Sequence, residues 1–179
     1  MSFLYFAYGS NLHPLRLAER TPSCMAIGPA RLKGHELRFH KRSLAAGDGS
    51  GKCDAFATGR PADVLHGAVY LIDLDDQPAL DAAEGNGRGY DRVVRRAETA
   101  AGSLAVELYI AQPGWIDPAL RPFDWYLELV VTGAAHHGLP IDYRRQVERT
   151  RALRDPDPGR SERHYRIARG AAARNGTTG

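Results

Sequence analysis

The sequence predicts an α+β domain in which a small closed or nearly closed mixed β-barrel is flanked by helices. Segments typical of strands come first, one helix lies in the middle, and the other helices are grouped late in the chain. This order argues against a doubly wound sheet, in which strands and helices alternate. Several long strands in a chain of 179 residues can close into a barrel, which removes exposed strand edges.

Most of the expected strands lie in the first half of the chain. The apolar, aromatic run at residues 3–8 predicts a buried strand, and Pro14 suits the first turn of a short helix after it. Residues 45–53 are rich in glycine and in small or polar residues, which predicts a mobile loop. Further strands are expected at residues 25–27 and 30–41, as one or two strands, and at 55–60 and 66–73.

A short helix and a hairpin are expected next. Residues 75–84 carry Pro78 in the first turn of a predicted helix that ends at Gly85. Residues 90–97 and 104–111 have the pattern of two strands joined by a short turn.

The helices after residue 122 are grouped together. Residues 123–137 place apolar side chains at helical spacing, and we expect further helices at 140–153 and 161–169. The remaining residues are small or polar and show no apolar periodicity. We therefore expect one domain over residues 1–169 and a disordered tail over residues 170–179.

Composition narrows the possible classes of protein. No apolar run is long enough to span a membrane, and the N-terminal residues lack the basic and apolar segments of a signal peptide. Cys24 and Cys53 match no metal-site spacing. Free thiols in a cytoplasmic protein are the simplest interpretation, with a disulfide between the two cysteines left open.

The basic residues are unevenly distributed. The net charge is +3, and arginine supplies all but three of the 24 basic residues. Positive charge is concentrated between residues 144 and 174, where Tyr165 is the only Phe, Tyr or Trp. Because single-stranded nucleic acids are bound by basic residues together with stacking aromatics, we favour a solvated basic face and expect no nucleic-acid partner.

The first predicted strand ends abruptly at Gly9-Ser10-Asn11. A strand that ends in bare backbone amides facing a helix start can hold a carboxylate or a phosphate. The alternative is an ordinary strand-to-helix turn, because turns select the same residue types.

Glu84 is the acidic residue that we single out for chemistry. It lies four residues after Leu80 and therefore on the same helix face, and Leu80 and Ala83 are expected to face the core. Burial and the helix C-terminus both disfavour its negative charge, so we expect its pKa to be raised toward that of a general base. The alternative is a surface glutamate before a glycine cap.

An ordered set of short motifs resembles the gamma-glutamylcyclotransferase-like family, over roughly residues 3–153. Each motif is modest, but their ordered combination is specific. The segments are YGSNL at residues 8–12, LDAAEG at residues 80–85 with Tyr90 after it, VELY at residues 106–109, and GLP at residues 138–140 after Tyr126.

The resemblance implies a small β-barrel and an enzyme that cleaves γ-glutamyl compounds by cyclisation. The substrate's own α-amine attacks its γ-carbonyl, which releases 5-oxoproline and an amine or amino acid without a metal or other cofactor. The resemblance implies that Glu84 is the catalytic acid/base. The residues it implies around the small γ-glutamyl substrate are Tyr8, Gly9, Ser10, Asn11 and Leu12 in the loop, and Tyr90, Tyr109 and Tyr126.

Two points stay open at this stage. The glycine-rich residues 85–89 depart from the family pattern where the leaving group should lie, so the resemblance does not identify the leaving amine. A non-catalytic small-molecule binding module with the same pocket is the alternative to an enzyme, although Glu84 argues weakly against a pure anion binder.

Overall fold

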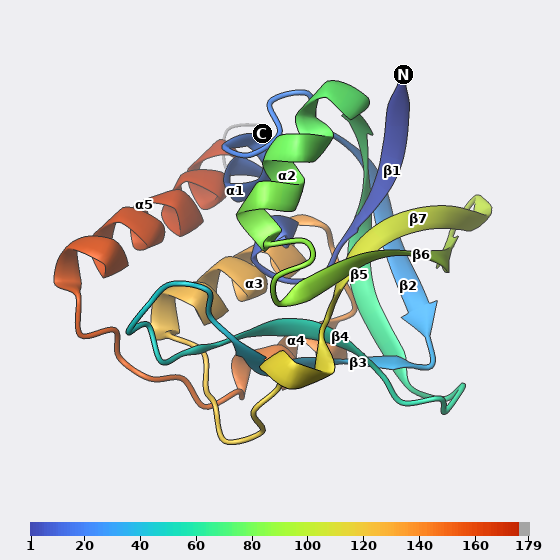
Figure 1. The fold of residues 1–179 in the computed structure, drawn as a ribbon. Helices are drawn as coiled ribbons and strands as arrows, with labels where there is room; N and C mark the ends of the chain where they lie inside the picture. Colours follow the sequence, from blue (N-terminus) through green and yellow to red (C-terminus); the bar gives the residue numbers. More distant parts are fainter. Residues whose placement is uncertain (176–179) are drawn as a thin grey trace.

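Five strands form a closed barrel in the order β1-β5-β2-β6-β7 (Figure 1). The computed structural model describes residues 1–175. Neighbouring strands are antiparallel except for β1 and β7, which pair in parallel at Tyr5 and Glu107 and close the barrel. The predicted mixed barrel is therefore confirmed. The barrel strands are β1 (Ser2–Ala7), β2 (Met25–Lys33), β5 (Val64–Asp73), β6 (Tyr90–Thr99) and β7 (Gly102–Ala111).

A separate two-stranded ribbon consists of β3 (His35–Arg42) and β4 (Gly51–Ala57). The chain breaks at Gly34, so the segment predicted as one or two strands is two. The loop predicted over residues 45–53 is too long, because its last three residues belong to β4. There the ladder continues through the pairs Arg42–Gly51 and Lys41–Lys52.

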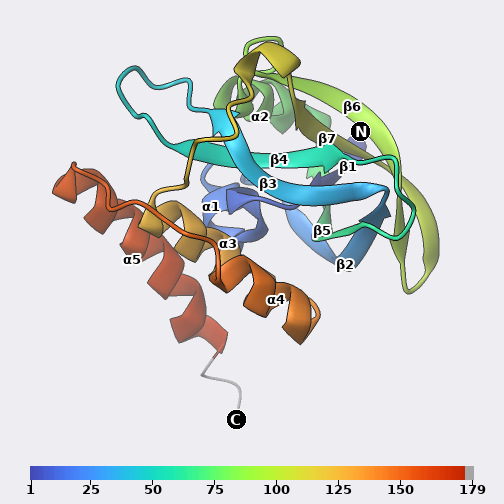
Figure 2. The ribbon, with the colours of Figure 1, turned by 90° about the horizontal axis from the view of Figure 1, so that it is seen from below.

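Helices cover one end and one side of these sheets. Figure 2 shows α3, α4 and α5 together on one side of the β3–β4 ribbon. None of the helices in the described part of the chain is long and apolar enough to cross a membrane. The α-helices are α1 (Pro14–Ala18), α2 (Gln77–Glu84), α3 (Asp124–His136), α4 (Ile141–Glu148) and α5 (Pro158–Asn175), and 3₁₀ turns lie at Ser10–Leu12, Leu74–Asp76 and Pro113–Trp115.

Two late helices differ in length from the prediction. Helix α4 ends at Glu148 because the chain then turns so that the Leu153 carbonyl accepts the Asp124 N–H at 2.9 Å. Helix α5 runs to Asn175 and so includes residues expected in a disordered tail. It is held on the domain by the buried Ala168, whose carbonyl lies 3.2 Å from Nε2 of His13. Residues 176–179 of the expected tail lie outside the described residues.

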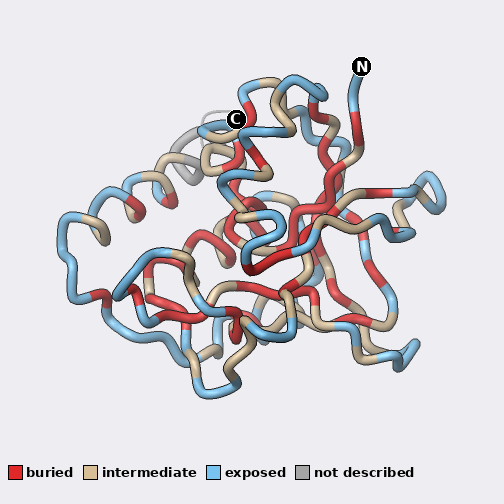
Figure 3. The backbone as a smooth tube through the Cα atoms, in the orientation of Figure 1, coloured by how far each residue is buried: buried red, intermediate tan, exposed pale blue. Residues whose placement is uncertain are grey.

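The core lies inside the barrel and beneath α3 (Figure 3). Helix α2 contributes Leu80, which is fully buried as expected, and it ends at Gly85 in the left-handed conformation. The expectation for Ala83 is wrong, because α2 crosses the barrel end with one buried side chain and leaves Ala83 exposed. Both cysteines are free thiols.

Candidate active site

The C-terminal end of α2 lies against the loop that follows β1. The Asn11 side-chain amide donates to Oε1 of Glu84 at 3.0 Å and to the Tyr5 hydroxyl at 2.9 Å. Gly9, Ser10, Asn11 and Glu84 line one small chamber, of about 20 Å³. The structure thus brings the two features singled out in the sequence to one place, although they are 73 residues apart.

Arg20 completes this group and was missed by the sequence analysis. Its guanidinium donates to Oδ1 of Asn11 at 2.7 Å and forms an ion pair with Oε1 of Glu84. Both charged side chains of the pair are less than one-fifth exposed. The prediction for Glu84 considered only burial and the helix end, whereas Arg20 places a positive charge against the carboxylate. An arginine two residues beyond a short helix gives no signal in the sequence that separates it from other surface arginines.

Close packing explains why glycine stands at position 9. A Cβ atom there would lie 2.9 Å from Cβ of Cys53 and 3.3 Å from its Sγ. Strand β4 therefore approaches the loop more closely than any side chain would allow. The N–H groups at the start of the 3₁₀ turn that follows have no partner within the turn, as at any helix start.

Five tyrosines line the chamber, four of them predicted. Tyr5 was missed, although it lies in the predicted first strand. Its hydroxyl accepts from Asn11, and no described residue accepts its proton. The other four hydroxyls bond to the protein itself. Three of them donate: Tyr8 to the Tyr109 carbonyl at 2.5 Å, Tyr90 to the Cys53 carbonyl, and Tyr109 to Asp81 at 2.7 Å. The Tyr126 hydroxyl accepts from the Cys53 N–H at 3.1 Å.

Burial keeps the chamber hydroxyls and the thiol protonated. It raises the pKa of Tyr5 far above its usual value, and the nearby Glu84 carboxylate adds to this increase. Burial likewise raises the pKa of Cys53, so its thiol is not activated as a nucleophile. The tyrosines therefore act as neutral hydrogen-bonding groups at neutral pH.

Leu12 differs from its predicted neighbours in the loop. Its side chain is fully buried in the core and lines neither the chamber nor the cavity beside it. Its carbonyl accepts from Nε2 of His137 at 3.0 Å and from the Tyr70 hydroxyl at 3.3 Å. Leu12 thus anchors the loop to α3 and β5.

A larger cavity of about 330 Å³ adjoins the chamber, and we call it the vestibule. It shares Ser10, Glu84, Tyr90 and Tyr126 with the chamber. Its outer wall comes from β3, from the segment leading into β4, and from α5. A ligand that reaches Glu84 through the vestibule therefore passes this outer wall first.

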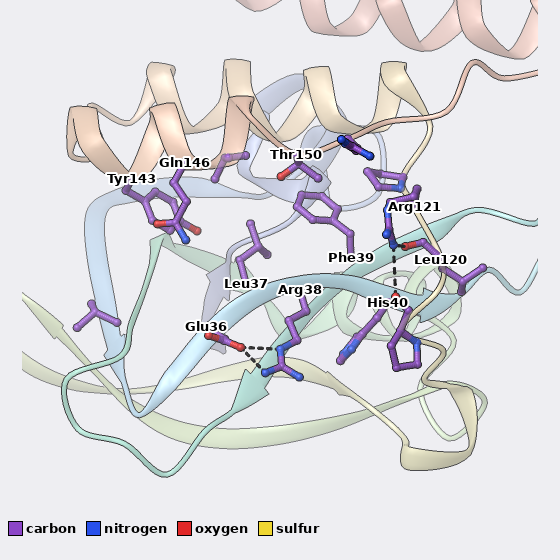
Figure 4. A pocket seen from close by; sticks show the side chains of 15 residues that line it. Glu36, Leu37, Arg38, Phe39, His40, Leu120, Arg121, Tyr143, Gln146 and Thr150 are labelled. Carbon is purple, nitrogen blue, oxygen red and sulfur yellow. Dashed lines mark hydrogen bonds and ion pairs between the residues drawn. The ribbon is translucent and has the colours of Figure 1, made fainter.

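A groove of about 570 Å³ lies between β3 and α4 (Figure 4). Leu37 and Phe39 point from β3 toward the helix, and Tyr143 and Gln146 point back. Its one carboxylate, Glu36, pairs with Arg38. A ligand-binding or catalytic site needs convergent polar groups as well as volume. We therefore place the candidate active site at Glu84 and not in this groove.

Sequence comparisons agree with the motifs. Residues 64–147 match the model of the AIG2-like family. The human protein named gamma-glutamylcyclotransferase is 30% identical over 156 residues, which cover 82% of this chain and 78% of the relative. The Bos taurus protein of the same name is 29% identical over 154 residues, with 82% and 77% covered.

Structural comparisons give the same result. A solved gamma-glutamyl cyclotransferase superposes with a TM-score of 0.82 at 27% identity, covering 95% of this chain and 99% of the other. A human crystal structure, titled as an uncharacterised protein, matches with a TM-score of 0.82 at 28% identity and covers 94% and 98%. These matches favour the expected enzyme over a binding module. The chain belongs to the gamma-glutamylcyclotransferase family and is an enzyme of that family.

Proposed function

We propose that this protein converts γ-glutamyl compounds to 5-oxoproline and a free amine or amino acid, with Glu84 as the general acid/base. The observation that carries this proposal is the position of Glu84. Its Oε1 is fixed by Asn11 and Arg20, whereas Oε2 has no hydrogen-bond partner among the described residues. One carboxylate oxygen thus orients the group while the other is available to accept a proton.

The reaction needs an amine to lose a proton as it attacks. The α-amine nitrogen of the substrate forms a bond to its own γ-carbonyl carbon, and the bond from that carbon to the leaving nitrogen breaks. Glu84 takes the proton from the attacking nitrogen and returns it to the leaving nitrogen, so no water is consumed. A positioned base of this kind contributes about 10²–10⁴-fold.

The groups that line the chamber and the adjoining vestibule suit the γ-glutamyl end of such a substrate. Gly9, Ser10 and Asn11 line the chamber, and in this proposal their backbone amides bind the substrate's α-carboxylate, as bare amides bind anions elsewhere. The neutral Tyr5 hydroxyl is a free donor beside Glu84 and suits the oxygen of the reacting carbonyl. Holding the amine and the carbonyl of one molecule close together lowers the entropic part of the barrier.

The test is incubation with a panel of γ-glutamyl amino acids, γ-glutamylamines and ε-lysine isopeptides, with 5-oxoproline as the measured product. We expect 5-oxoproline and free amine in equal amounts from at least one class. Release of glutamate instead of 5-oxoproline would show hydrolysis and contradict the proposal. Failure of every substrate would contradict it as well.

A further inference from the structure

Lys41 is a buried cation without an anionic partner, and it opens on the vestibule. The residue is 2% exposed, yet its ammonium has no hydrogen bond or ion pair among the described residues. It lies 4.3 Å from the centroid of the Tyr90 ring and 5.3 Å from that of Trp115. A buried ammonium is costly unless an anion or strong acceptors compensate it.

A β-bulge turns Lys41 toward the vestibule. Arg38 pairs with Asp54, and Lys41 pairs with Lys52, with a register shift between the two pairs. Asp54 and Lys52 are two residues apart and share a face of β4, so their partners Arg38 and Lys41 share a face of β3. In a regular strand, residues three apart lie on opposite faces and residues two apart share a face. Without the bulge, Lys41 would therefore lie on the face of Phe39 and not on that of Arg38.

The backbone opposite is shaped to admit this ammonium. A Cβ atom at Gly89 would lie 2.8 Å from Nζ of Lys41, so a side chain there would displace the ammonium, and the φ of +110° also favours glycine. Gly89 lies in the glycine-rich residues 85–89 that follow α2, so this segment and the buried lysine belong to one feature of the chain.

The other cations of the vestibule are mostly neutralised within the protein. Lys52 lies 3.2 Å from Asp48, Arg160 pairs with the Asp155 carboxylate, and Arg20 pairs with Glu84. Counting all of them, the wall still carries an excess of positive charge. The basic lining residues are Arg16, Arg20, Lys41, Lys52 and Arg160, and the acidic ones are Asp48 and Glu84.

We propose that Lys41 determines specificity for the leaving group, by pairing with a carboxylate or other anionic group on the departing amine. This proposal rests on the function proposed above. Substrates that release an amino acid are then preferred over those that release an uncharged amine. Among the amino acids, an acidic one is preferred over a neutral one, because its second carboxylate also meets this basic wall. At neutral pH Lys41 is mainly protonated, because burial lowers its pKa only to about 8 and Glu84 opposes that decrease.

The test compares substrates that differ in one charge. We would measure kcat/KM for γ-glutamyl-alanine, for γ-glutamyl-alaninamide, in which the leaving carboxylate is an uncharged amide, and for γ-glutamyl-glutamate. The native protein should favour γ-glutamyl-alanine over its amide by about 10–100-fold, the range of one charge-assisted hydrogen bond. γ-Glutamyl-glutamate should be the best of the three.

Variants of the three lysines supply the matched controls. Lys41→Met keeps the length of the stem and should reduce the acid-over-amide preference to less than about threefold, since the ammonium is gone. Lys41→Arg should retain most of the preference. Lys33→Met removes an exposed lysine that pairs with Glu98 on the barrel surface, and should change nothing.

Three results would decide against the proposal. Equal turnover of the acid and the amide by the native protein would overturn it, and so would an equal loss for both substrates in Lys41→Met. If Lys41→Met does not fold, Lys41→Arg decides. Loss of the acid-over-amide preference in Lys41→Arg would count against the proposal, and retention of that preference would support it. Absence of 5-oxoproline from every substrate would instead contradict the proposed function.

Discussion

The chamber at Glu84 and the groove between β3 and α4 differ in how their polar groups are used. In the groove, Arg38 pairs with Glu36 and lies 3.6 Å from the Phe56 ring centroid, and Arg121 donates to nearby backbone carbonyls. In the chamber, Oε2 of Glu84 and the Tyr5 proton have no partner among the described residues. The charged groups of the larger hollow are thus paired within the protein, whereas the smaller one has a charged group and a hydroxyl that can still bond to a ligand.

The difference shows that volume alone does not locate a catalytic site. The groove is about 570 Å³, and the chamber with its vestibule is smaller. Buried polar groups without internal partners are costly, so a protein retains them where a ligand supplies the partners. The predictions below test this distinction between the two regions.

The largest expected effect is that of Glu84→Gln in the chamber. The amide keeps the shape and an oxygen for Arg20 and Asn11 but cannot accept the proton, so 5-oxoproline release should fall by about 10²–10⁴-fold. Substrate binding should survive, because the loop amides and tyrosines remain. Turnover, ligand affinity and melting temperature should be measured together, with the exposed Glu148→Gln as the matched control. Full activity of Glu84→Gln would rule out its catalytic role.

Gly9→Ala should have the next largest effect. The new Cβ would meet Cβ of Cys53 at 2.9 Å, so the loop must shift away from β4. We expect a loss of about 1–3 kcal/mol in the free energy of unfolding, as for overpacked sites, together with a lower kcat. Gly114→Ala, whose Cβ would meet nothing within 4 Å, is the control for urea denaturation. Unchanged stability and activity in Gly9→Ala would show that the close packing is unimportant.

Much of this architecture could be predicted from the sequence because its signals are local. The aromatic run that ends at Gly9, the helix end at Gly85 and the hairpin of β6 and β7 each depend on neighbouring residues. A local pattern also singled out Glu84, whereas four of the chamber tyrosines were expected only from the resemblance to the family. Local patterns could not show that the Tyr90 hydroxyl bonds to the wall, because its partner, Cys53, is 37 residues away.

The missed features depend on contacts between distant segments. Arg20 meets Glu84 across 64 residues, and nothing in its own neighbourhood indicates this. The bulge that turns Lys41 is visible only when β3 and β4 are paired. Helix α5 is stabilised by packing on the domain, so a sequence with little apolar periodicity gave no signal for its full length.

The stability of the protein should depend on pH through two histidines, one of which, His164, lines the vestibule. Burial, aided by nearby cations, lowers the pKa of His164 to about 4, and burial lowers that of His137 to about 4. Since the unfolded value is 6.5, the unfolded chain binds protons first as the pH falls. Stability is therefore complete above about pH 6.5 and decreases until about pH 4. Between pH 7 and 5 we expect a loss of up to about 2 kcal/mol for each histidine.

Urea denaturation at both pH values measures this loss. His164 stacks on Trp125 with ring centroids 4.0 Å apart, so His164→Phe keeps an aromatic ring but removes the titrating group. The variant should lose less stability between pH 7 and 5 than the native protein. An identical loss in both would assign the effect to other groups.

The smallest expected effect lies in the groove, at Tyr143→Phe. The Tyr143 hydroxyl is buried without a hydrogen-bond partner among the described residues, while its ring contacts His66 at 4.9 Å between centroids. Removing an unsatisfied buried hydroxyl costs no hydrogen bond, so the free energy of unfolding should stay constant or rise by about 1 kcal/mol. Release of 5-oxoproline should not change, because the groove takes no part in the reaction. A loss of more than about 1 kcal/mol would mean that the hydroxyl has a partner in solution, such as an ordered water or a bound molecule. The groove would then hold a polar group that bonds to a partner from outside the protein, as proposed for the chamber, and the contrast between the two regions would fail.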